Sequence, residues 1–207
     1  MKNIILIVIM GLLIVSCNDE FLEKSSLSAI SAESFWKTER DATLAINGVY
    51  TVLQEQPMYG GCLNSTGNNG LSQYDCFGDN SYNQYEFEGM GNYVEGNADP
   101  SLQMFSNKWN TLYRGIGRAN IAIENIPTIP LTALSLSKRN AFLGQATFLR
   151  ALFYMELAMY YEEAPLILKF QKLEESYVPK NTYAELKDQI IKDLDFAILN
   201  LPDTHPT

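Results

Sequence analysis

Apolar side chains recur at helical spacing in four segments of this chain, and the pattern restricts the fold to a mainly α-helical one. The predicted helices cover about residues 38–53, 105–123, 137–161 and 182–201. The first opens at Thr38 with the sequence TERD, which resembles a capping box with Asp in place of the usual Glu. A proline follows each helix within a few residues and stops it. We expect the second and third helices to pair as a hairpin across a proline-containing connection.

Residues 57–101 interrupt the helical pattern. Eight of the 13 glycines lie here together with several asparagines, and neither helical nor strand spacing persists for long. Long irregular segments in compact domains are usually functional or disordered, and the many aromatic side chains argue against disorder. We therefore expect an ordered, irregular insertion between the first and second helices.

The last predicted helix starts with a capping box, Thr182 to Glu185, and carries an apolar stripe. The stripe consists of Leu186, Ile190, Leu194, Ala197, Ile198 and Leu201. No helix follows it in the sequence, so it either packs back onto the preceding pair or lacks the partner that a helical repeat needs. We expect a longer protein whose C-terminal half is missing here.

The chain begins with an export signal. The apolar run Ile4–Val15 follows a lysine and is too short to span a bilayer comfortably, so we interpret it as a cleaved leader. Residues 14–17, IVSC, match a lipobox, in which Cys17 is acylated and becomes the mature N-terminus. The alternative is an ordinary secretory signal with a chance cysteine, but no A-x-A site competes. We expect a signal peptide over residues 1–16, a lipid on Cys17 and a polar tether over residues 17–30.

Charge and motifs argue against several classes of function. Cleavage after residue 16 removes one of the 15 basic side chains and none of the 24 acidic ones, so the net charge changes from −9 to −10. Such a chain repels nucleic acid. The single histidine, His205, lies in a proline-rich terminal stretch, which argues against a zinc site. The sequence contains no P-loop, dinucleotide fingerprint, HExxH or nucleophile elbow, so we expect no cofactor, no metal and no catalytic residue.

Two cysteines remain beyond the lipobox, Cys62 and Cys76. Export places them in an oxidising compartment, where a disulfide is permitted. A bridge closing this 15-residue loop contributes roughly 3 kcal/mol in the chain-entropy model. Two buried free thiols are the equal alternative.

The insertion contains the best candidates for a ligand site. Residues 74–85 combine aromatic rings, which have an apolar face and suit exposed ligand contacts, with planar amides and carboxylates, which form hydrogen bonds. The candidate residues are Asp79, Asn80 and Tyr82, followed by Tyr74 and Tyr85. The alternative is that the rings pin the loop onto the helices while the Asp and Asn side chains make local turns.

Other prominent residues are expected to be structural. Trp109, Tyr113 and Phe153 lie on helical stripes and are expected in the core. Arg150 interrupts an otherwise apolar face. We expect it to pair with a carboxylate or to cap carbonyl groups, because a buried unpaired charge is costly.

Motifs along nearly the whole chain, taken in order, resemble the N-terminal part of the SusD/RagB family of outer-membrane nutrient-binding lipoproteins. They are Cys17 with Phe21–Leu22, Glu33–Ala42, Ile46–Tyr50, Trp109–Asn120, Gly144–Tyr154, Ala164–Leu166 and Ile191–Pro202. The most recognisable is ATFLRALFY, which resembles the family's A-x-F-L-R-A-x-x-Y run. The chain departs from the family at Glu162–Glu163, where a glycine-containing turn is usual, and in the absent C-terminal half.

The resemblance implies tetratricopeptide-like helical hairpins over residues 31–207, with a long irregular insertion. It also implies a non-catalytic surface lipoprotein that binds oligosaccharide, or else peptide, and delivers it to a SusC-like TonB-dependent receptor. Asn18–Glu20 resembles the acidic signal that directs such lipoproteins to the exterior of the outer membrane. One alternative is a lipid-anchored helical-repeat adaptor that binds only proteins. Another is a surface glycosidase that uses Asp75 and Asp79.

Replacing the lipobox cysteine tests the anchor. Cys17→Ala should move the protein from the membrane fraction to a soluble fraction, because acyl chains contribute about 0.8 kcal/mol per buried CH₂. Cell fractionation with immunoblotting measures the change. If the variant stays on membranes that lack its transporter partner, lipid is not the main anchor.

Overall fold

The computed structural model describes residues 35–59, 100–101, 103–175 and 177–204. Four long α-helices account for most of this part of the chain: α3 (Glu39–Tyr50), α6 (Gln103–Asn125), α7 (Leu136–Tyr161) and α8 (Tyr183–Asn200). All four lie in one compact unit that begins at Trp36. The mainly α-helical fold class predicted from the sequence is confirmed.

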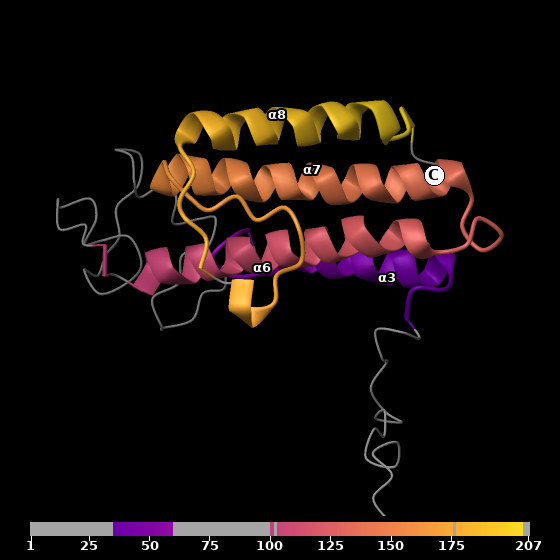
Figure 1. The fold of residues 1–207 in the computed structure, drawn as a ribbon, viewed down its shortest axis with the longest axis horizontal. Coiled ribbons are helices and arrows are strands. Elements are labelled where there is room, and N and C mark those ends of the chain that lie inside the picture. The colour runs from indigo at the N-terminus through magenta and orange to yellow at the C-terminus, as the bar shows by residue number, and fades with distance from the viewer. Residues whose placement is uncertain (1–34, 60–99, 102, 176, 205–207) are drawn as a thin grey trace, which may run out of the picture. The chain divides into compact units, whose positions relative to one another are not determined.

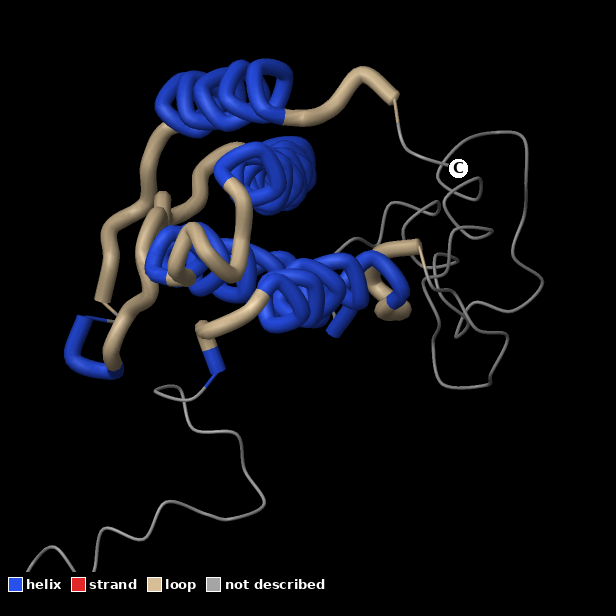
Figure 2. Tube along the Cα trace, turned by 90° about the vertical axis from the view of Figure 1, so that its right-hand side faces the viewer, coloured by secondary structure: helices blue, strands red, loops and turns tan. Residues whose placement is uncertain are grey.

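The helices stack in layers within this unit. Figure 1 shows α8 above α7 and α7 above α6, each running in the opposite direction to its neighbour. The rotated view in Figure 2 shows α3 beside α6, on the side away from α8. The predicted hairpin of the second and third helices is confirmed, because α6 and α7 follow one another in the chain and pack against each other.

Short irregular elements connect the helices. α3 ends three residues earlier than predicted and continues as a 3₁₀ turn, Thr51–Gln54. A second 3₁₀ turn, Ile126–Thr128, leads from α6 toward α7. Between α7 and α8, Ala164 and Asn181 form an antiparallel bridge, the one β contact in the described residues. This bridge closes the segment 164–181 into a loop beside the helices.

Both predicted capping boxes are present. At the start of α3 the Asp41 carboxylate accepts hydrogen bonds from the Thr38 backbone N–H (2.8 Å) and hydroxyl (2.7 Å). The hydroxyl bond is the main reason that the pKa of Asp41 is lowered. At the start of α8, Glu185 accepts from the Thr182 backbone N–H at 2.8 Å, and its pKa is lowered chiefly by that bond. Each carboxylate satisfies a backbone donor that the helix leaves without a partner.

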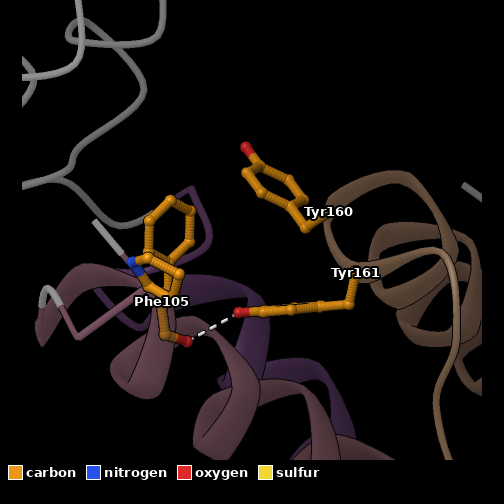
Figure 3. Close-up of a pocket in the computed structure, with 4 residues that line it drawn as sticks. Phe105, Tyr160 and Tyr161 are labelled. Atoms are coloured by element: carbon orange, nitrogen blue, oxygen red, sulfur yellow. Dashed lines mark hydrogen bonds between the residues drawn. The ribbon is translucent and has the colours of Figure 1, made fainter. Parts of the chain in front are cut away.

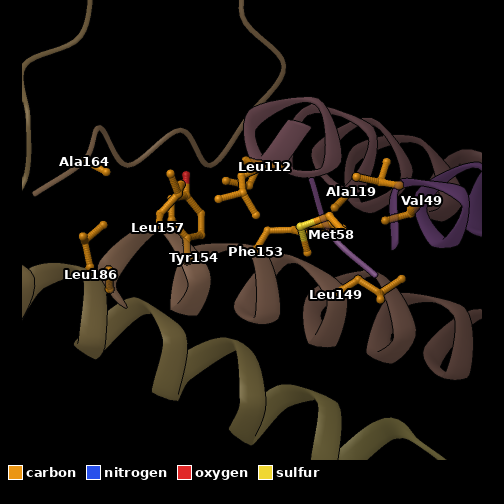
Figure 4. Close-up of a cluster of buried hydrophobic side chains, with 13 residues drawn as sticks. Val49, Met58, Leu112, Ala119, Leu149, Phe153, Tyr154, Leu157, Ala164 and Leu186 are labelled. Atoms are coloured by element: carbon orange, nitrogen blue, oxygen red, sulfur yellow. The ribbon is translucent and has the colours of Figure 1, made fainter. Parts of the chain in front are cut away.

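The main hydrophobic core lies between α3, α6 and α7 and reaches α8 through Leu186 (Figure 4). Phe153 is fully buried in this core, as predicted. Trp109 and Tyr113 pack against the same cluster but are only partly buried. These two residues therefore form the edge of the core rather than its centre, where a polar atom of the side chain can still find a partner.

Part of the predicted apolar stripe of α8 packs back onto α7. Leu186 and Ala197 are buried, and Ile190 packs against the main core. Of the two options left by the sequence, packing back onto the preceding pair is therefore the one observed for these residues. The prediction was wrong for Ile198, which is 75% exposed; its neighbour Leu199 is 83% exposed, so the end of α8 leaves two apolar side chains in solvent.

The end of α7 has an unusual backbone conformation. Glu162 has φ 59° and ψ −49°, the single positive φ among the described non-glycine residues. Such a conformation costs on the order of 1–3 kcal/mol for a residue with a Cβ atom and little for glycine. Glu162 thus stands at a position that suits glycine, which agrees with its place in the motif where a glycine-containing turn is usual.

Two glycines of α6 allow a matched test of helix packing. A Cβ atom on Gly115 would lie 2.5 Å from Cε2 of the buried Phe153, whereas one on Gly117 would meet no atom within 4 Å. Gly115→Ala should lower the free energy of unfolding by about 1–3 kcal/mol, because the Phe153 ring must move in a packed core. Gly117→Ala should raise it by up to about 1 kcal/mol, because alanine favours the helix.

Urea denaturation curves of the two variants and the parent chain measure the difference. Equal effects of the two substitutions would show that α6 and α7 do not approach as closely as described.

Candidate functional site

A buried ion pair joins α7 to α8. The Arg150 Nε and Nη2 atoms donate to Oδ2 and Oδ1 of Asp193, each at 2.7 Å. The two residues are only 7% and 4% exposed. The remaining Arg150 nitrogen, Nη1, donates to Oδ1 of Asn120 on α6 at 2.8 Å. The prediction that Arg150 pairs with a carboxylate is confirmed, and the pair connects three helices.

The same network holds the segment that follows α7. The Asn120 amide donates to the carbonyl of Ile167 at 2.8 Å, and the Tyr154 hydroxyl donates to the same carbonyl at 2.9 Å. The Tyr113 hydroxyl donates to the carbonyl of Pro165 at 2.8 Å. Burial raises the pKa of both tyrosines, so their hydroxyls stay protonated and remain donors at neutral pH. This cluster directs its polar atoms inward and therefore acts as scaffold rather than as a binding site.

An aromatic pocket lies where the start of α6 meets the end of α7. It has a volume of about 360 Å³, and its described lining is Pro100, Phe105, Tyr160 and Tyr161. The antiparallel arrangement of α6 and α7 brings these residues together across more than fifty positions of sequence. Figure 3 shows Tyr161 reaching across from α7 to donate a hydrogen bond to the Phe105 carbonyl, at 2.6 Å.

Tyr161, one of the lining residues, belongs to a group of aromatic rings in contact. The Trp109 ring meets the Tyr161 ring edge to face, with centroids 5.0 Å apart and an interplanar angle of 88°. Tyr113 lies against the other side of this group, its ring centroid 4.9 Å from that of Trp109. Such geometries contribute about 0.5–1.5 kcal/mol per pair beyond burial. The Tyr161 ring is therefore held in a defined orientation.

A buried charge pair lies beneath Tyr160. Lys108 Nζ is 2.8 Å from a carboxylate oxygen of Glu156, and the two side chains are 4% and 12% exposed. The same ammonium lies 4.9 Å from the centroid of the Tyr160 ring. The Tyr59 hydroxyl donates to Glu156 at 3.2 Å. The ammonium holds the Tyr160 ring by a cation–π contact, while Glu156 balances its charge.

This arrangement suits binding of a neutral ligand with flat apolar faces. The described lining of the aromatic pocket consists of a proline and three aromatic side chains and carries no carboxylate. Apolar pockets with a few fixed polar groups are the usual form of small-molecule sites. In the described ranges, no three His, Cys, Asp or Glu side chains gather as metal ligands do. None of the helices described here has the length and apolarity needed to cross a bilayer.

The ligand residues predicted from the sequence lie outside the described residues. They are Tyr74, Asp79, Asn80, Tyr82 and Tyr85. The possible disulfide partners Cys62 and Cys76 and the lipobox residue Cys17 lie outside them as well. These assignments stay predictions.

The aromatic pocket was not predicted from the sequence, although a signal for it was present. Tyr160 and Tyr161 end one member of the predicted hairpin, and Phe105 begins the other. An antiparallel hairpin places these two ends side by side. Lys108 gave no signal, because nothing in a sequence shows that a lysine is buried beneath a ring.

Comparison with known proteins gives a consistent result. The model of a SusD-like family, described as "Starch-binding associating with outer membrane", matches residues 20–206. SusD-like protein P25 of Formosa agariphila is 30% identical over 217 residues, which cover 99% of this chain and 39% of the relative. SusD-like protein P2 of the same organism is 31% identical over 207 residues, which cover 98% and 39%. The chain thus spans about two fifths of the length of these curated relatives.

Solved structures have the same fold. A laminarin-binding SusD-like protein superposes with a TM-score of 0.70 at 26% identity, covering 82% of this chain and 36% of that one. A SusD-like carbohydrate-binding protein from Bacteroides fragilis superposes with a TM-score of 0.67 at 24% identity, covering 82% and 33%. The second likeness, at this identity, supports the fold alone.

The buried ion pair is open to a direct test. Asp193→Ala should lower the free energy of unfolding by about 3–5 kcal/mol, because it leaves the Arg150 guanidinium buried without a carboxylate. Asp195→Ala is the matched control, since Asp195 is exposed on the same helix, and should change stability by no more than about 0.5 kcal/mol. Thermal and urea denaturation measure both variants. Similar stabilities for the two would show that the pair does not connect the helices.

Proposed function

This chain belongs to the SusD-like family, and on that basis we propose that it is a non-catalytic glycan-binding lipoprotein of the cell surface. The observation that carries the proposal is the aromatic pocket, whose rings Phe105, Tyr160 and Tyr161 suit the apolar C–H faces of sugars. The described lining offers no pair of carboxylates for glycoside hydrolysis. The pocket therefore favours capture of a glycan over cleavage.

The ligand class we propose is a neutral glucan oligosaccharide. The family description names starch, and one structural neighbour binds laminarin; both ligands are uncharged polymers of glucose. A net charge of −9 disfavours polyanionic glycans. Peptide is the second choice of ligand.

The proposal includes residues 74–85 as further ligand-binding residues. We assign Asp79, Asn80 and Tyr82, with Tyr74 and Tyr85 behind them, to the same glycan-binding role. Their carboxylate, amide and phenol groups hydrogen-bond hydroxyls, a Tyr ring also suits the face of a sugar, and the described lining of the aromatic pocket has no amide or carboxylate side chain.

The proposed setting is the outer membrane. Acylation of Cys17 anchors the chain, and the acidic residues that follow direct it to the exterior. There it associates with a SusC-like TonB-dependent receptor and passes the oligosaccharide on for import. Support for this setting comes from the lipobox and from the family description, which associates its members with the outer membrane.

A second candidate function is that of an adaptor that binds only proteins. The exposed apolar side chains of Ile198 and Leu199 on α8 favour it, because such faces commonly form protein contacts. A glycan titration separates the two functions, since an adaptor does not bind oligosaccharide.

Substitution of Tyr160 tests the glycan-binding function. Calorimetric titration with laminarihexaose and maltohexaose should show binding by the unmodified chain. Tyr160→Ala should weaken it at least tenfold, the equivalent of about 1.4 kcal/mol, because a flat contact surface is lost. A melting curve of the same variant separates loss of the contact from loss of the fold.

Tyr177→Ala is the control, because Tyr177 is 98% exposed and lies outside the aromatic pocket. Unchanged glucan binding by Tyr160→Ala would remove the pocket from the proposal. Absence of binding by the unmodified chain would favour the adaptor.

A further inference from the structure

A second concave site lies on the other side of α6. We call it the polar hollow; it has a volume of about 380 Å³. Its polar lining residues are Glu55, Gln56, Asn107, Asn110, Thr111 and Arg114. Four of these come from α6 and two from the segment just after the 3₁₀ turn that follows α3.

The polar hollow and the aromatic pocket occupy opposite faces of one helix. Residues 107, 110, 111 and 114 follow the i, i+3, i+4, i+7 spacing of a single helical face. Phe105 lies about 200° from Asn107 around the helix axis, because each residue advances about 100°. The first half of α6 therefore presents rings to one side and amides, a hydroxyl and a guanidinium to the other.

The charges in the polar hollow cancel. Arg114 Nη1 donates to both carboxylate oxygens of Glu55, each at 2.8 Å. Thr111 donates its hydroxyl to the same carboxylate at 3.3 Å. The Arg114 side chain is 49% exposed and that of Glu55 is 25% exposed, so both face the open side of the hollow. The site thus presents a fixed, neutral pair rather than a free charge.

The remaining polar groups are available to a ligand. Within the described ranges, the Nε and Nη2 atoms of Arg114 and the side-chain amides of Asn107 and Asn110 make no hydrogen bond to other protein groups. An amide supplies both donors and an acceptor, and a guanidinium presents donors in one plane. A sugar ring with adjacent hydroxyl groups needs this combination, since each hydroxyl both donates and accepts.

We propose that the polar hollow is a second saccharide site, which binds the hydroxyl edge of a neutral sugar. This inference rests on the proposed glycan-binding function. An anionic sugar gains little there, because Glu55 offsets the charge of Arg114. An apolar ligand is disfavoured, because it would bury these polar groups without hydrogen bonds.

Two sites on one chain have a consequence for long glycans. A polysaccharide that occupies the aromatic pocket of one chain and the polar hollow of the same or another chain binds more tightly than a short oligosaccharide. Short oligosaccharides then bind at each site independently, and only a longer glycan gains from occupying both.

Removal of two amides tests the second site. The double variant Asn107→Ala/Asn110→Ala keeps the Glu55–Arg114 pair and changes only exposed side chains. Calorimetric titration of the full chain with laminarihexaose should show two binding events for the parent. The double variant should lose one of them or weaken it at least tenfold, and Tyr160→Ala should lose the other. Asn47→Ala, an exposed amide on α3, is the matched control and should keep both.

The outcomes separate this inference from the function on which it rests. A parent chain with one binding event, lost in Tyr160→Ala and intact in the double variant, overturns the second site and leaves the glycan-binding function standing. A parent chain that binds no glucan overturns both. Titration of Tyr160→Ala with a glucuronic acid oligosaccharide tests the ligand class. Binding as tight as that of laminarihexaose would overturn the assignment to neutral sugars.

Discussion

The ion pair between Arg150 and Asp193 is the interaction on which the arrangement of the other elements depends. Two buried charges lose their hydration on folding, and only good geometry with further hydrogen bonds offsets that loss. Here the two bonds of 2.7 Å and the third bond to Asn120 meet this requirement. Apolar contacts tolerate sliding of one helix along another, whereas this pair has one productive position. We infer that it sets the register of α6, α7 and α8.

The aromatic pocket depends on that register. With α7 held antiparallel to α6, its last turn lies beside the first turn of α6, and the two ends together form the aromatic pocket. The close approach is possible because Gly115 leaves room for the Phe153 ring. The same network holds Ile167 in place, so the chain leaves α7 in a fixed direction. Scaffold and pocket are thus built from different residues of the same two helices.

The two opposite faces of α6 present two kinds of surface. One face carries Phe105 and Trp109 toward α7, and the opposite face carries Asn110 and Arg114 toward solvent. Rings suit the faces of a sugar and planar polar groups suit its edge. The proposed glycan-binding function uses both kinds of group, and a single helix supplies them because its side chains point outward in every direction.

The sequence by itself determined the helices, their caps and the family. Periodic apolar residues and the Thr38 and Thr182 caps act through neighbours three or four positions away, so local pattern was sufficient. The sequence also showed that Arg150 needs a partner, because a buried charge is costly unless a carboxylate or carbonyl groups pair with it. Only the tertiary structure decided that the partner is Asp193, 43 residues away, and that Phe105 meets Tyr161 at an inter-helix hydrogen bond. Such pairings depend on the register between helices, which no local pattern shows because it is set by contacts between residues far apart in the sequence.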